Sequence, residues 1–95
     1  MNMAIETTRW DIAEHLDSDE AVAAYLDAVF EAGDAAEIRD AIAHVVRARG
    51  MTEIAREAGI SRAGLYKALG TDGNPSFETV SAVLKALGVR MGVAA

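Results

Sequence analysis

The chain has 95 residues, 52% of them hydrophobic, which suffices for one small domain with a core of its own. The absence of Cys excludes disulfides and thiolate metal sites and fits a reducing cytoplasm, where we expect the protein to act. The formal net charge is −6, which is unusual for a protein that binds nucleic acid. We find no signal-peptide pattern and no run of the ~20 apolar residues that a membrane span requires, so no membrane contact is predicted.

Charge is divided unevenly between the two parts of the chain. Residues 1–40 contain eleven carboxylates and two arginines, a net charge of −9. Residues 41–95 contain seven basic and four acidic residues, a net charge of +3. Such an asymmetry predicts two partners of opposite charge. Solubility of a small protein is the alternative explanation for the acidic part.

Helix signals begin early, and a single proline with little β-branched clustering indicates an all-α fold. Asp11 and Glu14 have the spacing of a capping box for a short helix over Trp10–Leu16. Ser18 is expected to cap a longer helix over Asp19–Ala32. The apolar positions of this longer helix recur with helical spacing: Val22, Tyr25, Leu26, Val29 and Phe30.

A second capping box, Asp34 with Glu37, opens a helix that is predicted to run to about Ala48. Its inward face is Ile38, Ala41, Ile42, Val45 and Val46. Arg47 and Arg49 lie near its C-terminus, where cations suit the helix dipole but could also reach phosphates. We assign a phosphate contact to Arg49.

The segment Met51–Gly70 is predicted to form two short helices joined by a tight turn. Thr52 and Ser61 are the expected N-caps, and Gly59 can adopt the left-handed conformation that ends the first helix. The inner positions are Ile54, Ala55, Ala58, Ile60, Leu65, Ala68 and Leu69. This arrangement is typical of a helix-turn-helix, whose second helix enters the DNA major groove. An ordinary helix pair in a bundle is the alternative.

The outward face of the second helix favours DNA, because its side chains are small or can donate hydrogen bonds. The predicted base contacts are Ser61, Arg62, Ala63 and Tyr66. The predicted phosphate contacts in and beside this motif are Arg49, Thr52, Arg56 and Lys67.

After a loop over Thr71–Pro75, Ser76 is predicted to cap a last helix over Phe77–Leu87. Its apolar stripe is Phe77, Val80, Val83, Leu84 and Leu87. Asn74 and Ser76 are assigned phosphate contacts, because backbone N–H groups at a helix start can bind phosphate. Alternating apolar residues over Val89–Val93 predict a short C-terminal strand that pairs with a symmetry mate or a partner, with a frayed end as the alternative.

Nothing in the residue pattern calls for catalysis. His15 and His44 lie on different predicted helices, without a nucleophile or acid at useful spacing, and are expected on helix surfaces. We predict no metal, no cofactor and no small-molecule substrate.

Three blocks carry a resemblance to a known family: AEHLDSDEAVAAYLDAVFEAGD (13–34), RARGMTEIAREAGISRAGLYKAL (47–69) and GNPSFETVSAVLKALGV (73–89). Over about Asp11–Val89 the chain resembles the HigA-like addiction-module antidotes, or antitoxins, a branch of the lambda-repressor-like DNA-binding proteins. The resemblance implies a five-helix repressor-like core with extra N-terminal helices. It also implies a cytoplasmic homodimer on a near-palindromic operator, and a small basic toxin of the RelE-type ribonuclease class as partner. The second helix opens with Ser61-Arg62 where better-known repressors have Gln-Gln or Gln-Thr, so the base preference does not carry over.

These observations predict two parts, an acidic helical extension over residues 1–33 for partner or dimer contact and a DNA-binding helix-turn-helix domain over residues 34–95. The first functional hypothesis is an antitoxin that neutralises a toxin and represses its own operon. The alternatives are a stand-alone prophage-type repressor without a toxin, and a protein-interaction bundle that has lost DNA binding.

Overall fold

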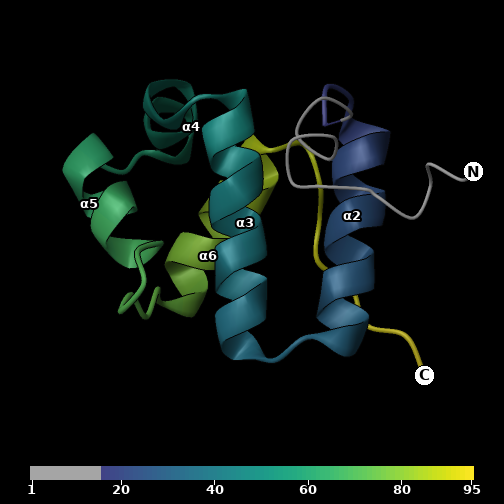
Figure 1. Ribbon diagram of the computed structural model, residues 1–95. Coiled ribbons are helices and arrows are strands. Elements are labelled where there is room, and N and C mark those ends of the chain that lie inside the picture. The colour runs from purple at the N-terminus through teal and green to yellow at the C-terminus, as the bar shows by residue number, and fades with distance from the viewer. Residues whose placement is uncertain (1–15) are drawn as a thin grey trace, which may run out of the picture.

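The structure, a computed structural model, describes residues 16–95. Within that range the chain forms five helices and no strand, which confirms the all-α prediction for the described part. The helices are α2 (Asp19–Ala32), α3 (Ala35–Arg49), α4 (Met51–Ala58), α5 (Arg62–Ala68) and α6 (Phe77–Ala86). In Figure 1, α2 and α5 lie on opposite sides of α3 and α6. The predicted helix over Trp10–Leu16 and the position of His15 fall outside the described residues, apart from Leu16, which is buried.

Side-chain caps begin four of the five helices, as the sequence predicts. The Ala21 N–H donates to Ser18 Oγ at 3.1 Å, and the Thr79 N–H donates to Ser76 Oγ at 3.1 Å. Ser61 caps α5 in the same way. Asp34 and Glu37 form the complete capping box, each backbone N–H donating to the other's side chain at 2.9 Å. Each cap satisfies a backbone donor that the helix itself leaves unpaired.

The predicted Thr52 cap is wrong. Gly50 occupies the cap position of α4, with φ of 114° and no side-chain hydrogen bond, and Thr52 is already the second helical residue. The physical reason is that α3 and α4 are joined without a loop. The Gly50 N–H donates to Val46 O at 2.7 Å and its carbonyl accepts from the Ile54 N–H at 3.0 Å, so one glycine ends one helix and begins the next.

A single apolar cluster holds the described helices together. α3 packs against α2 and α4, and α4 also packs against α5 and α6. Val22 and Leu26 of α2 belong to this cluster together with Leu65 of α5 and Leu84 of α6. The acidic helix α2 is therefore anchored in the same core as the helices that follow it.

Two predicted core positions are wrong. Phe77 is 75% exposed and Phe30 is 41% exposed. Phe77 is the first residue of α6, and a helical side chain leans toward the N-terminus, so this ring projects beyond the contact between helices. Phe30 lies in the last turn of α2 and borders a surface groove.

The predicted C-terminal strand does not form within this chain. Residues 89–95 have no regular secondary structure and run alongside α2 (Figure 1). Residues 16–95 contain no strand, so no extended backbone is available to pair with this segment. Gly88, with φ of 84°, turns the chain after α6, and the Val89 N–H donates to Leu84 O at 3.1 Å. Val89 is thereby held against the core.

No helix in the described range is both long enough and apolar enough to span a bilayer.

Candidate nucleic-acid interface

The turn between α4 and α5 has the geometry that its sequence predicts. Gly59 is left-handed, with φ of 73°, and its N–H donates to Arg56 O at 3.2 Å. The Ile60 N–H then donates to Ala55 O at 2.9 Å. Ala55 and Leu65 are buried between the two helices. The small Ala55 side chain allows close packing, and the opposite face of α5 is left outward.

That outward face carries the predicted base contacts Ser61, Arg62, Ala63 and Tyr66 and the predicted phosphate contact Lys67. All five are exposed. Ser61 Oγ accepts from the Gly64 N–H at 2.9 Å, so its oxygen serves the cap. Arg62 Nη2 donates to Tyr66 Oη at 3.4 Å, and the Arg62 guanidinium lies 5.4 Å from the Tyr66 ring centroid. Arg62 is therefore held along the helix surface by its neighbour one turn later.

A groove of about 520 Å³ runs beside α5 and continues to the start of α4. We call it the basic groove; its lining residues are Arg47, Gly50, Met51, Thr52, Glu53, Arg62 and Tyr66. It brings two guanidinium groups, from α3 and α5, to the end of α4 that has no side-chain cap. The partial positive charge of a helix N-terminus adds to theirs, so the groove can attract an anion.

Arg49 lies elsewhere. Its Nη2 forms an ion pair with Asp19 Oδ1 at 3.0 Å, and its Nε donates to Leu16 O at 3.3 Å. Arg47 and Arg49 are two residues apart, about 200° around the helix, so only one of them can face the basic groove. Arg49 follows the apolar positions Val46, Val45 and Ile42 by three, four and seven residues, so it lies on the inward side of α3, and helical spacing favours Arg47 for the outer groove.

The other predicted phosphate contacts are distributed over two places. Arg56 and Lys67 are exposed on α4 and α5, and Arg56 forms only a surface ion pair with Glu53 at 2.8 Å. Ser76 Oγ is engaged in capping α6 and donates to Thr79 Oγ1 at 3.1 Å. Asn74 borders a different groove, together with Pro75 and Phe77. Neither loop residue lines the basic groove.

No pattern in the sequence predicts the role of Arg39. Its Nη1 donates to the Gly73 carbonyl at 3.0 Å, and this bond ties the loop after α5 to α3. The two residues are 34 positions apart, and no local pattern connects them. The bond fixes where the loop begins its path to α6.

His44 is only half-buried, but its Nε2 is buried without a hydrogen-bond partner, which corrects the prediction of a plain surface residue. The ring of Tyr25 stands edge-on to it, with centroids 6.1 Å apart. Within residues 16–95, no three His, Cys, Asp or Glu side chains lie close enough together to bind a metal ion.

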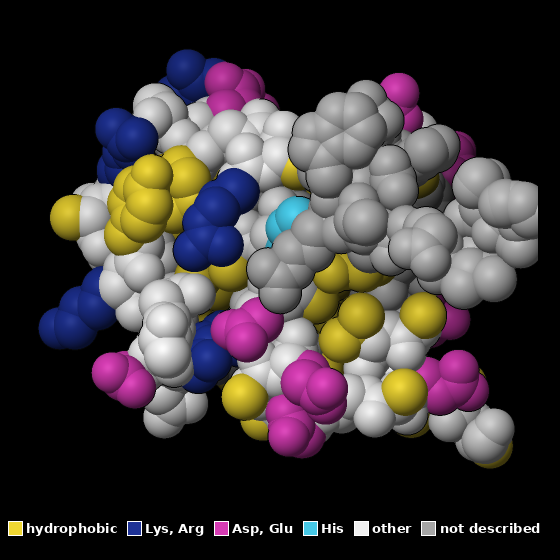
Figure 2. Space-filling model, viewed as in Figure 1, with side chains coloured by type: hydrophobic (Ala, Val, Ile, Leu, Met, Phe, Trp, Pro, Cys, Tyr) yellow, Lys and Arg dark blue, Asp and Glu magenta, His cyan; other side chains and the backbone are white. Residues whose placement is uncertain are grey.

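Basic and acidic side chains are unevenly distributed over the surface. Figure 2 shows most Lys and Arg side chains over α4 and α5, with a few carboxylates beside them, and several carboxylates toward the lower ends of α2 and α3. The carboxylates that α2 and its flanking residues expose are Asp17, Asp19, Glu20, Asp27, Glu31 and Asp34. The charge asymmetry in the sequence is thus an asymmetry of the folded surface.

Comparison with known proteins places the chain in a family. A family model described as "Probable addiction module antidote protein" matches residues 6–95. An uncharacterized protein of Haemophilus influenzae is 48% identical over 84 residues, which cover 88% of this chain and 87% of that protein. No solved structure matches the chain. With nearly its whole length matched, the chain belongs to the family of probable addiction module antidote proteins.

Proposed function

We propose that this antidote is a homodimeric, sequence-specific DNA-binding protein of the HigA-like, lambda-repressor-related type. It neutralises a small basic RelE-type ribonuclease toxin and represses its own operon at a near-palindromic operator. We assign it to the cytoplasm and assign it no catalytic step, cofactor or small-molecule substrate. Membership of an antidote family supports a toxin partner in general, whereas the DNA activity rests on the surface of α4 and α5.

The observation that carries the DNA proposal is the joining of Arg47, Arg62 and the uncapped start of α4 around one groove. A backbone phosphate seated at the α4 end of the groove meets the Arg47 guanidinium and the free N–H groups of the helix start. From that anchor, the exposed face of α5 enters the major groove, with Arg62 donating two bonds to a guanine. Ser61, Ala63 and Tyr66 contact neighbouring bases.

The phosphate contacts set the position of the protein on DNA. We assign them to Arg47, Thr52, Arg56 and Lys67, with Asn74 and Ser76 at the loop before α6. The Arg56–Glu53 pair is exposed, so a phosphate can replace the carboxylate at little cost. Arg49 is the weakest candidate in this set, because Asp19 and Leu16 already occupy its guanidinium.

The acidic surface of α2 is where we place the toxin. The helix that carries these exposed carboxylates, α2, lies on the other side of α3 and α6 from α5 (Figure 1), so the antidote can hold the toxin and the operator together. Opposite potentials on the two proteins would also speed their encounter.

Fluorescence anisotropy tests the DNA activity, with a labelled duplex from upstream of the gene and a set of single-base variants of it. We expect strong loss of affinity between ~50 and ~200 mM salt, because several phosphates are contacted. Arg62→Ala should cost about 1–3 kcal/mol at one base position only. Lys67→Ala should weaken all duplexes alike. Lys85→Ala, a charge change on α6, is the matched control. Unchanged base preference in Arg62→Ala contradicts the assignment.

The toxin activity is tested by expressing the adjacent reading frame with and without this chain, scoring growth and co-purification. Growth arrest that this chain relieves, together with a stable complex, supports the proposal. A harmless neighbour, or one that does not bind, removes the assigned toxin.

A further inference from the structure

A groove of about 530 Å³ lies on the face where α2, α3, α6 and the loop after α5 meet. Phe77 and Phe30, the two exposed phenylalanines, line it with the half-exposed Met91. We call this the apolar face and define it by six of the lining residues: Phe30, Ile38, Pro75, Phe77, Val80 and Met91. Exposed apolar side chains gathered in one place are a mark of an interaction surface.

The apolar face offers no available charge to a partner. Among residues 16–95, Arg39 is the one charged residue that lines this groove, and its guanidinium donates to Gly73 O and Asp40 Oδ1, both at 3.0 Å. The Arg39 side chain is accordingly only 15% exposed. DNA and a basic toxin would both gain little there, because each needs opposite charge. The partner surface that would best complement the apolar face is therefore itself apolar.

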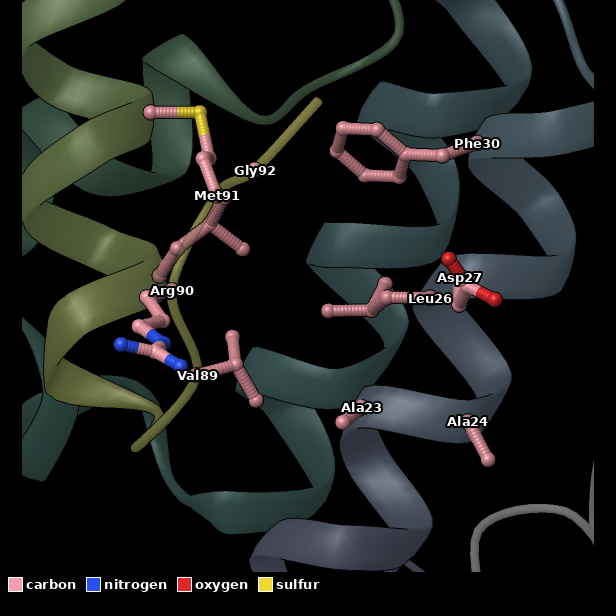
Figure 3. A pocket seen from close by; sticks show the side chains of 10 residues that line it. Ala23, Ala24, Leu26, Asp27, Phe30, Val89, Arg90, Met91 and Gly92 are labelled. Atoms are coloured by element: carbon pink, nitrogen blue, oxygen red, sulfur yellow. The ribbon is translucent and has the colours of Figure 1, made fainter. Parts of the chain in front are cut away.

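A second groove of about 480 Å³ continues the apolar face between α2 and the C-terminal residues, with Phe30 and Met91 lining both grooves. In Figure 3, Leu26 and Phe30 point from α2 toward the C-terminal segment, and Val89 points back at them. The charges of this second groove are of opposite sign, Asp27 on α2 and Arg90 on the C-terminal segment. Neither side chain forms an ion pair with any of residues 16–95.

We propose that the apolar face is the dimer interface, and that its occupant is a second copy of this chain. In a two-fold contact the same patch meets itself, so an uncharged apolar centre faces an uncharged apolar centre. Asp27 of each copy then faces Arg90 of the other, which makes two ion pairs at the rim. The face is thus complementary to itself in both hydrophobicity and charge.

This inference deepens the homodimer of the proposed function and rests on it. Pro75 ends the loop that leaves α5 and Phe77 begins α6, so we place the two-fold axis next to that loop. The two α5 helices are then related by the same axis, as two adjacent half-sites of a near-palindromic operator require.

Sedimentation velocity of the full chain tests the interface, since a monomer has a mass of 10.0 kDa and the dimer twice that. Phe77→Asp changes an exposed side chain, so the fold should survive, which circular dichroism checks. We expect this variant to weaken dimerisation at least ~30-fold, as for a central interface residue. Val93→Asp, fully exposed and outside the apolar face, is the matched control and should stay dimeric.

A charge exchange tests the register. Asp27→Arg and Arg90→Asp should each weaken the dimer, and the double variant should restore it. Loss without restoration overturns the Asp27–Arg90 pairing. A monomeric wild type at ~100 µM, or an unchanged dimer in Phe77→Asp, overturns the interface itself.

A single half-site duplex separates this proposal from the DNA proposal. Phe30→Asp changes the apolar face on α2, away from the assigned phosphate contacts Asn74 and Ser76. It should bind one half-site as the wild type does, and lose only the gain from the second half-site. If the dimer forms through the apolar face but no duplex binds, the DNA proposal alone fails.

Discussion

Arg62 and Tyr66 form a stacked pair on the outer face of α5, with the guanidinium 5.4 Å from the ring centroid and a 3.4 Å hydrogen bond to the hydroxyl. The pair is fully local, because the two residues are one turn apart. It limits the directions in which the guanidinium can point before any DNA arrives. In the proposed function, Tyr66 therefore orients Arg62 as well as contacting a base.

We expect Tyr66→Ala to reduce discrimination at the base that Arg62 reads by about 2–5-fold, since an exposed cation–π contact is worth about 0.5–1 kcal/mol. Tyr66→Phe keeps the ring and should keep most of the preference. Anisotropy on the single-base duplex set measures both. The double variant with Arg62→Ala should lose little more at that base than Arg62→Ala alone. Independent effects at different bases would contradict the orienting role.

Arg47 and Arg49 allow a test of which arginine at the end of α3 meets phosphate. Arg47→Ala should lower the slope of log affinity against log salt by about 0.9, the loss of one phosphate contact. Arg49→Ala should leave that slope unchanged and cost at most about 1 kcal/mol of folding stability, because its pair with Asp19 is partly exposed. The opposite pattern would return the phosphate contact to Arg49.

The features that the sequence predicts correctly are those decided within one or two helical turns. Ser18, Asp34, Ser61 and Ser76 cap helices because their partners are three residues away, and Gly59 is left-handed because of its own turn. The capping prediction fails at Thr52 because the junction of α3 and α4 leaves the cap position to Gly50.

The other incorrect predictions concern whether another helix packs over a side chain and buries it. Periodicity gives the side of a helix on which Phe30 and Phe77 lie, but it does not say whether another element reaches that far. In the site, the helix pair and the outward residues of α5 follow from the sequence. The Arg49–Asp19 pair and the Arg39 bond to the loop join residues about 30 positions apart, and they appear only in the fold.

A substitution at Gly59 measures how much the left-handed backbone of the turn between α4 and α5 contributes to folding stability. A Cβ at Gly59 would meet no atom within 4 Å, so Gly59→Ala tests the backbone conformation alone. We expect a loss of about 1–2 kcal/mol in urea unfolding, because φ of 73° disfavours any residue with a Cβ. Gly92→Ala has equal space but no positive φ, and should stay within about 0.5 kcal/mol of the wild type. Equal effects of the two changes would refute this account of the turn.

Val22 tests whether the acidic helix α2 folds together with the DNA-binding part or independently of it. Its side chain is 0% exposed and belongs to the cluster that also contains Leu65 and Leu84. Val22→Ala removes two buried methyl groups and should cost about 2 kcal/mol. Because the core is shared, amide hydrogen exchange at Leu65 and Leu84 should speed up by the same free energy as exchange within α2. Val93→Ala, at a fully exposed position, is the control. If Val22→Ala accelerates exchange in α2 alone, then residues up to 33 unfold separately, and the toxin could be held or released without disturbing α4 and α5.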